Sequence, residues 1–411
     1  MWILYYAGIY LLVFAIRISS LWNEKSRLWL SGRKNWKKDL TQISGNDSPR
    51  IWVHVSSLGE FEQARPAIES LKRQSPQTKI VLTFFSPSGY TIRRNYQYAD
   101  VLYLPPDLPG NASYWLDRIQ PDLAVFVKYD LWPGYLAALD RKNIPAILIS
   151  AHWHPGKMFG SWSMPLSKSY LKKFRKIFFQ RSEHVSYFQK QGFDNISIAG
   201  DTRIDRVLSL PTEADTKIPG DLKLFPPFDM VAGSTWPEDE ALICDIVNTS
   251  SKRIIIAPHD ISSSRIEDLA SKLKVKYCRL SQLAANDAEV SVVIVDTIGL
   301  LAYLYSLGKV AYVGGGFGKG IHNILEPMAF DKPVIFGPRH ERFPEAVDSV
   351  QRGNGFVIRN VKELRDLLHA LEDPTLAERL GTSSRKYLEE HSGASILVTN
   401  YILDSIPFPS E

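Results

Sequence analysis

The chain has 411 residues, of which 45% are hydrophobic and 23% are charged, so it is too long for one typical core and too apolar to be disordered. The formal net charge of +5 is modest, and no long basic tract indicates nucleic-acid binding. The only cysteines, Cys244 and Cys278, exclude a disulfide framework and a cysteine-based metal cluster.

Residues 1–16 contain no charged side chain, and Arg17 ends this apolar run. The run lacks the basic start and the cleavage site of a secretory signal, and it is short for a spanning helix, which needs about 20 residues. The residues that follow are mainly basic: Arg17, Lys25, Arg27, Arg33, Lys34, Lys37 and Lys38, against Glu24 and Asp39. We expect residues 1–40 to be an uncleaved helix and basic flank on the anionic lipids of the inner membrane, with the rest of the protein on the cytoplasmic face. The alternative is a buried first helix of a soluble fold.

From residue 51 onward, apolar strand-like runs alternate with helical segments such as 61–74, which predicts parallel β-α-β units. The first series has strands at 51–55, 79–84, 123–127, 145–149 and 176–179. Residues 210–227 show no periodicity, so we place the domain boundary there. A second series has strands at 228–232, 253–257, 290–295 and 310–313. We therefore expect two Rossmann-like α/β domains facing a cleft, at 41–210 and 211–411, and the last helix could pack back on the first domain.

The turn after the first strand contains Ser57, Gly59 and Glu60. One interpretation is a helix start, in which Ser57 and Glu60 form a capping box. The other is a carboxylate held at the end of a strand, where Glu60 accepts a proton from an attacking hydroxyl. Glu62 is close in sequence but occupies a different helical position, so Glu60 is the candidate base.

A glycine-rich run at 314–320 follows the strand at 310–313 and precedes a segment with Asn323 and Glu326. Glycines allow the backbone to approach a phosphate, and a helix N-terminus provides amide donors. Asn323 and Glu326 are three residues apart and share a helical face, where they could address ribose or sugar hydroxyls. The alternative is a tight turn followed by a capped helix.

Three further candidates end neighbouring strands. Ser234 and Thr235 suit a phosphate or carboxylate, or else cap the next helix; His259 suits a phosphate or base, or else has a structural role. No Asp-x-Asp pair occurs in the sequence, although metal-dependent sugar-nucleotide enzymes commonly need one. The sequence therefore favours a mechanism without metal, in which basic groups and a helix N-terminus neutralise the leaving phosphate.

Taken in order, several of these elements resemble the signatures of 3-deoxy-D-manno-octulosonic acid (Kdo) transferases. The resemblance runs from the N-terminal segment to near the C-terminus, and the matching elements are residues 57–60, 130–133, 200–205, 233–235, 296–299 and 314–327. Each element is weakly specific, but their order and spacing together are specific.

The resemblance implies a GT-B fold, with the acceptor on the N-terminal domain and the nucleotide on the C-terminal domain. It implies inverting transfer of Kdo from CMP-Kdo to a lipid A precursor, lipid IVA, in lipopolysaccharide core biosynthesis, with no cofactor. Glu60 takes the role of general base, in a turn with Ser57 and Gly59. Donor contacts fall on Ser234, Thr235, His259, Gly315, Gly316, Asn323 and Glu326.

The sequence departs from the family pattern at three places. Lys128 stands where many members have an acid, and His259 stands where many have an arginine, for which Arg265 is a candidate replacement. Gly316 replaces a common serine. Two other functions stay open: a UDP-sugar-dependent GT-B enzyme acting on a lipid-linked acceptor, and a membrane-attached binding protein that has lost catalysis.

Overall fold

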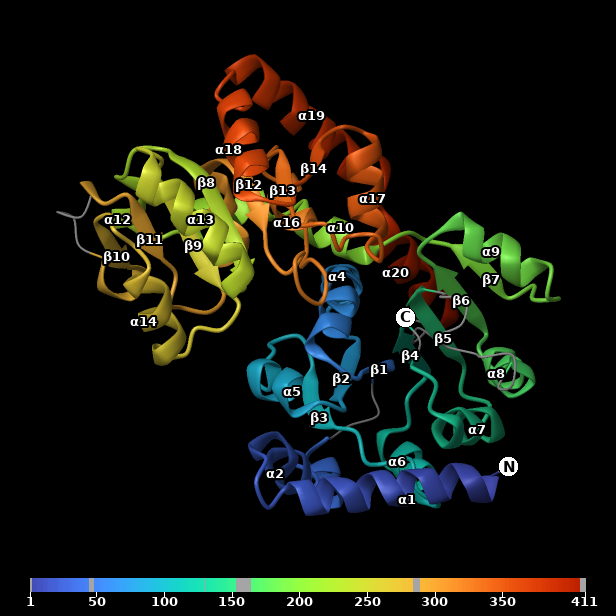
Figure 1. Ribbon diagram of the computed structural model, residues 1–411. Coiled ribbons are helices and arrows are strands. Elements are labelled where there is room, and N and C mark those ends of the chain that lie inside the picture. The colour runs from blue at the N-terminus through green and yellow to red at the C-terminus, as the bar shows by residue number, and fades with distance from the viewer. Residues whose placement is uncertain (1, 44–47, 129, 153–163, 284–288, 407–411) are drawn as a thin grey trace. The chain divides into compact units, whose positions relative to one another are not determined.

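The computed structural model describes residues 2–43, 48–128, 130–152, 164–283 and 289–406, and the chain forms two compact units (Figure 1). The first unit comprises Met1–Asp205 and Ser392–Glu411, and the second comprises Arg206–His391. The sequence places the boundary a few residues later, at 210–227. That segment is not the irregular linker we expected, because it forms two short helices, α11 (Leu210–Lys217) and α12 (Gly220–Lys223), in which Leu210, Ala214 and Leu222 are buried.

The first unit is built around a seven-stranded parallel sheet with the order β3-β2-β1-β4-β5-β6-β7. Its strands are β1 (Arg50–Val55), β2 (Lys79–Phe84), β3 (Asp100–Tyr103), β4 (Leu123–Val127), β5 (Ala146–Ala151), β6 (Lys176–Phe179) and β7 (Ile196–Ile198). Its helices are α1 (Trp2–Ser19), α2 (Glu24–Ser31), α3 (Trp36–Asp39), α4 (Leu58–Gln74), α5 (Pro87–Arg93), α6 (Asn111–Ile119), α7 (Pro133–Arg141), α8 (Met164–Leu171), α9 (Ser182–Gln189) and α20 (Ala394–Ser405), and α10 (Thr202–Val207) crosses into the second unit.

The second unit repeats this plan with the strand order β10-β11-β9-β8-β12-β13-β14, again all parallel. Its strands are β8 (Phe228–Thr235), β9 (Ile254–Pro258), β10 (Tyr277–Arg279), β11 (Val292–Ile294), β12 (Gly308–Val313), β13 (Val334–Phe336) and β14 (Gly355–Val357). Its helices are α11 (Leu210–Lys217), α12 (Gly220–Lys223), α13 (Pro237–Thr249), α14 (Ser263–Ser271), α15 (Leu301–Leu304), α16 (Leu325–Met328), α17 (Pro344–Gln351), α18 (Val361–Ala370) and α19 (Pro374–Glu390). The prediction of two Rossmann-like α/β units is confirmed.

The central strands are buried on both faces, which is why they read as unbroken apolar runs. Alternate residues of β1 enter opposite cores: Trp52 packs with α6 and α7, whereas Ile51 and Val53 pack with α4 and α20. Burial on both sides is the usual state of a parallel strand between helix layers.

The segment at residues 200–205 holds the last helix on the first unit. The Asp205 carboxylate accepts hydrogen bonds from the backbone N–H groups of Gly393 and Ser395, both at 2.6 Å, at the start of α20. The Thr202 hydroxyl donates to the Gln63 carbonyl of α4 at 2.6 Å. This part of the family signature therefore has a structural explanation.

Candidate active site

The first candidate site lies at the carboxyl ends of β1 and β4. β1 pairs with β2 on one side and with β4 on the other, so the strand order changes direction between β1 and β4. In open α/β sheets, ligands bind in the crevice at such a switch point. Glu60, in the first turn of α4, and Asp130, which follows β4, both belong to this edge.

Glu60 is fixed by a capping box, as one of the two interpretations of the sequence predicts. Its backbone N–H donates to Ser57 Oγ at 3.4 Å, and its Oε2 atom accepts from the N–H groups of Ser56 at 2.5 Å and Ser57 at 3.2 Å. The residue is only 7% exposed. The cap is compatible with a role as base, because it holds the carboxylate in one orientation at the edge of the sheet.

Asp130 is electrostatically paired with Glu60. Its Oδ2 atom accepts a 2.7 Å hydrogen bond from Ser56 Oγ and lies 3.5 Å from His54 Nε2. Burial and the neighbouring charge of Glu60 raise the pKa of Asp130 to about 8. Burial also raises the pKa of Glu60, but two backbone amides and Lys128 oppose the rise. We therefore assign the shared proton to Asp130 and the negative charge to Glu60.

The surroundings of the pair agree with this assignment. Burial lowers the pKa of His54 to about 3, so its imidazole is neutral and cannot neutralise Asp130 as a cation. Lys128 has a left-handed backbone, with φ of +61°, and its positive charge lowers the pKa of both Glu60 and Asp201. Glu62 lies apart from the pair, in ion pairs with Arg65 and Arg93.

The second candidate site lies in the second unit, at the carboxyl ends of the adjacent strands β9, β8 and β12. Here three aromatic rings are stacked. The Trp236 and His259 rings are 4.7 Å apart, the His259 and His322 rings are also 4.7 Å apart, and Trp236 Nε1 donates to His322 Nε2 at 3.2 Å. Burial and His259 lower the pKa of His322 to about 4, so this histidine is neutral. His259 itself is exposed.

Two of the predicted donor contacts are already used within the protein. The Thr235 hydroxyl donates to the buried carboxylate of Glu240 at 3.2 Å, and the Gly315 N–H donates to the buried carboxylate of Asp239 at 2.9 Å. Neither proton is therefore directed at a phosphate. Ser234 is half-buried and has φ of +54°. Of the two hydroxyl groups at the end of β8, that of Ser234 is better placed than that of Thr235 to contact a phosphate.

Glycine is favoured at position 315 by the backbone conformation and at position 316 by the lack of space for a side chain. Gly315 has φ of +93°, in the region that favours glycine. A Cβ atom on Gly316 would lie 2.6 Å from the Cα atom of Gly337, so a serine has no room here without a shift of the backbone. The departure at Gly316 therefore accompanies close packing of the loops after β12 and β13.

Asn323 and Glu326 lie together, but not on a long helix. Asn323 Nδ2 donates to Glu326 Oε1 at 3.1 Å, and Asn323 Oδ1 accepts from the Leu325 N–H at 3.2 Å. α16 spans only four residues, Leu325–Met328, so the expected helix dipole is small and that part of the prediction was wrong. Both side chains remain partly exposed.

Arg265 does not replace the expected phosphate-binding arginine in this arrangement. Its guanidinium pairs with the fully buried carboxylate of Glu240 and with Asp268. A buried carboxylate requires such a partner, because an unpaired buried charge is costly.

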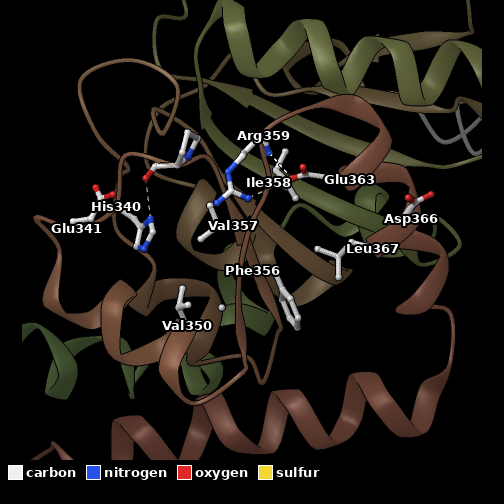
Figure 2. A pocket seen from close by; sticks show the side chains of 12 residues that line it. His340, Glu341, Val350, Phe356, Val357, Ile358, Arg359, Glu363, Asp366 and Leu367 are labelled. Atoms are coloured by element: carbon white, nitrogen blue, oxygen red, sulfur yellow. Dashed lines mark hydrogen bonds and ion pairs between the residues drawn. The ribbon is translucent and has the colours of Figure 1, made fainter.

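The second unit also contains a pocket of about 630 Å³ beside β14 and α18 (Figure 2). Its apolar wall includes Phe356 and Leu367, and its polar groups are His340, Glu341, Arg359, Glu363 and Asp366. Three acids against one arginine make this pocket unsuitable for a phosphate. None of the residues predicted to contact the donor lines it.

Comparison with known proteins supports the assignment of the fold and family. A family model described as 3-Deoxy-D-manno-octulosonic-acid transferase (kdotransferase) matches residues 33–206. The 3-deoxy-D-manno-octulosonic acid transferase of Aquifex aeolicus (strain VF5) is 28% identical over 354 residues, covering 83% of this chain and 92% of that protein. The protein of the same name from Rickettsia bellii (strain RML369-C) is 25% identical over 357 residues, covering 83% and 84%. These matches confirm that the chain resembles the Kdo transferase family, and they identify it as a glycosyltransferase.

Solved structures show the same fold at low sequence identity. The UDP-GlcNAc 2-epimerase from Neisseria meningitidis, bound to UDP-GlcNAc, has a TM-score of 0.63 and 15% identity, covering 86% of this chain and 100% of that one. MurG from Acinetobacter baumannii has a TM-score of 0.51 and 10% identity, covering 87% and 99%. These likenesses confirm the GT-B type of fold.

The sequence does not predict the pairing of Asp130 with Glu60, or the ring stack of Trp236, His259 and His322. Asp130 is there only a part of the signature at residues 130–133. The missing signal is the adjacency of β1 and β4, since Ser56 and Asp130, which are 74 positions apart, meet only when these two strands are neighbours.

Proposed function

We propose that this glycosyltransferase transfers Kdo from CMP-Kdo to a lipid A precursor with inversion, and that Glu60 is the general base. The observation that carries the proposal is the buried pair of Glu60 and Asp130 at the switch point of the first sheet. A charged carboxylate beside a protonated one is suited to accept a proton from a hydroxyl.

In the proposed step, a hydroxyl oxygen of the acceptor sugar forms a bond to the anomeric carbon of Kdo. The bond from that carbon to the phosphate oxygen breaks, and CMP leaves with the electron pair. The hydroxyl proton passes to the Glu60 carboxylate. Asp130 acts through Glu60 as a positioning residue, because its proton stabilises the negative charge on Glu60 before the transfer.

We assign the donor to the second unit, at the ends of β8, β9 and β12. Ser234 and the exposed His259 are polar groups that could contact its single phosphate, and Asn323 with Glu326 could address the ribose hydroxyls. Preorganised donors of this kind stabilise a leaving phosphate without large rearrangement. The pair Asn323 and Glu326 fits a diol, because an amide and a carboxylate together offer both donor and acceptor atoms.

We also propose that the protein works at the cytoplasmic face of the inner membrane. α1 has a mean hydropathy of 1.6 and no buried residue, and it is the one helix of the described segments that is long and apolar enough to cross a membrane. Exposed basic residues follow it. An apolar segment and a basic flank are the two signals that stable association with anionic lipid requires.

The proposed reaction is tested with the purified full chain, a tetra-acylated lipid A precursor and a panel of CMP- and UDP-sugars. Mass spectrometry of the products should show addition of Kdo only with CMP-Kdo. Transfer from a UDP-sugar instead would favour the alternative donor class. No transfer from any donor by a folded, membrane-bound sample would contradict the proposal.

A further inference from the structure

The first helix is attached to the first unit at both of its ends. Near its start, the Tyr5 hydroxyl donates a 2.7 Å hydrogen bond to Asp107 Oδ2, and the Trp2 ring lies 6.3 Å from that of Tyr170. At its other end, Ser19 Oγ and Ser26 Oγ are 2.6 Å apart, which joins α1 to α2. Figure 1 shows α1 as one long helix that leads to α2.

The Tyr5 hydroxyl binds a buried side chain that the fold holds in place. Asp107 is fully buried, and its Oδ2 atom also accepts the N–H of Gly134 at 2.7 Å, at the start of α7. A Cβ atom on Gly134 would lie 2.1 Å from Asp107 Oδ1, so the aspartate fills the available space. Withdrawing Tyr5 would remove one donor from a buried carboxylate, which is unfavourable.

Side-chain exposure along α1 follows the helical period. Six residues of α1 are half-buried, and they form one stripe: Tyr5, Tyr6, Ile9, Val13, Ile16 and Ser19. Spacings of three and four residues, with Tyr6 next to Tyr5, place them on one side of the helix, which faces the unit. The other side is apolar and exposed: Ile3, Leu4, Leu11, Phe14 and Ile18.

A spanning orientation conflicts with these contacts. With Arg17 at the cytoplasmic surface, Tyr5 would lie roughly 18 Å deeper, at 1.5 Å per residue. Asp107 and α7 belong to the folded unit and could not follow it. The whole of α1 would also reach only about 27 Å, against a hydrocarbon core of about 30 Å.

We propose that α1 lies in the plane of an anionic phospholipid surface, with its half-buried stripe on the protein and its apolar side in the lipid. This inference rests on the proposed membrane location and specifies its geometry. The surface is expected to be anionic because basic side chains outnumber acidic ones around this segment. The exposed basic residues are Arg17, Lys25, Arg27, Lys34, Lys37 and Lys38, against Glu24 and Asp39.

The same arrangement connects the lipid surface to the first candidate site. Arg33, which follows α2, lies 4.9 Å above the Phe85 ring. Phe85 packs on Trp132 at 4.9 Å, Trp132 packs on His54 at 5.8 Å, and His54 faces Asp130. The membrane-facing segment is thus packed against the wall of the site, which suits an acceptor whose acyl chains stay in the bilayer.

The test uses three single-cysteine variants of the full chain in a Cys244→Ala, Cys278→Ala background. Leu4→Cys, Leu11→Cys and Ile18→Cys are seven residues apart on the exposed side of α1, so labelling them does not disturb the stripe. Each carries a fluorescent label and is bound to vesicles of phosphatidylglycerol and phosphatidylethanolamine. The vesicles contain lipids brominated at either a shallow or a deep acyl position.

The in-plane geometry predicts equal quenching at the three positions, stronger with the shallow bromines than with the deep ones. Strongest deep quenching at Leu11→Cys, with weaker quenching at both flanking positions, would show a spanning helix and overturn the proposal. No lipid-dependent quenching at any position would overturn it too. Kdo transfer to a soluble acceptor, measured on the same samples, separates either failure from failure of the proposed reaction.

Discussion

The Ser56 hydroxyl donates a 2.7 Å hydrogen bond to Asp130 Oδ2, and this bond connects the end of β1 to the residues after β4. The Ser56 backbone N–H donates at the same time to Glu60. One residue therefore contacts both carboxyl groups and holds them at the switch point of the sheet.

Asp130→Asn should remove a pH-dependent loss of stability. The folded pKa of about 8 exceeds the ordinary value of 3.8, so between these values the folded protein keeps a proton that the unfolded chain has lost. The free energy of unfolding of the wild type therefore falls, through this group, as pH rises to about 8. Asparagine does not titrate, so the free energy of unfolding of Asp130→Asn should increase relative to that of the wild type as pH rises over this range.

Denaturant midpoints at about pH 5, 7 and 9 check this expectation. Ser88→Ala serves as a control for general effects of substitution, because Ser88 is exposed in α5, the helix that follows β2 in the same sheet. A stability difference between Asp130→Asn and the wild type that does not change with pH would contradict the shared proton.

The sequence was informative where local pattern determines structure. The strands at 79–84, 123–127 and 176–179 have the predicted bounds, because long apolar runs mark strands buried on both faces. Short strands such as β7, β10 and β14 were missed, since three residues carry little periodicity. Glu60 was found because its capping signal is local. Its pairing with Asp130 depends on which strands are neighbours, and no local pattern records that.

The role of Arg33 shows the same limit. We grouped it with the basic residues that face lipid, and this was wrong, because its side chain is only 6% exposed. Its guanidinium lies 4.0 Å above the Trp29 ring and donates to the carbonyls of Leu104 at 2.8 Å and Phe85 at 2.7 Å. Burial lowers the pKa of Arg33 to about 9, so it is still charged at neutral pH.

Arg33→Met should therefore destabilise the first unit, whereas Lys34→Met should weaken binding to lipid. The first change leaves buried carbonyls without a donor and should lower the free energy of unfolding by about 2 kcal/mol or more. The second removes an exposed charge and should reduce affinity for anionic vesicles about fivefold. Thermal unfolding and vesicle co-sedimentation of both variants give the comparison. Equal thermal stability of Arg33→Met and the wild type would contradict the structural role.

Glu326→Gln should weaken the binding of CMP about tenfold or more, because it removes a charge-assisted hydrogen bond to the nucleotide. The amide preserves the shape and can still meet Asn323, so folding should be unchanged. Titration calorimetry with CMP measures the effect, and Glu341→Gln at an exposed loop position is the matched control. Equal affinity of the Glu326 variant and the control would give Glu326 a structural role only.

Activity should persist in excess EDTA. The sequence has no Asp-x-Asp pair, and a donor with one phosphate can be neutralised by protein groups alone. Initial rates before and after dialysis against EDTA are the measurement. A loss that magnesium restores would indicate a carboxylate site for metal, for which Asp130 and Asp296 are the first residues to test.

The most direct test of the central claim compares turnover and donor binding in Glu60→Gln. Glutamine still accepts the Ser56 and Ser57 amides, so the cap persists, but it cannot take up the acceptor proton. With CMP-Kdo and the lipid A precursor, we predict a fall in turnover of ~10²–10⁴-fold. Affinity for CMP should stay within a few-fold, and Glu62→Gln, whose carboxylate lies in separate ion pairs, should remain active. Retention of more than about a tenth of wild-type turnover by a folded Glu60→Gln variant would contradict the account and leave Glu60 as a helix cap alone.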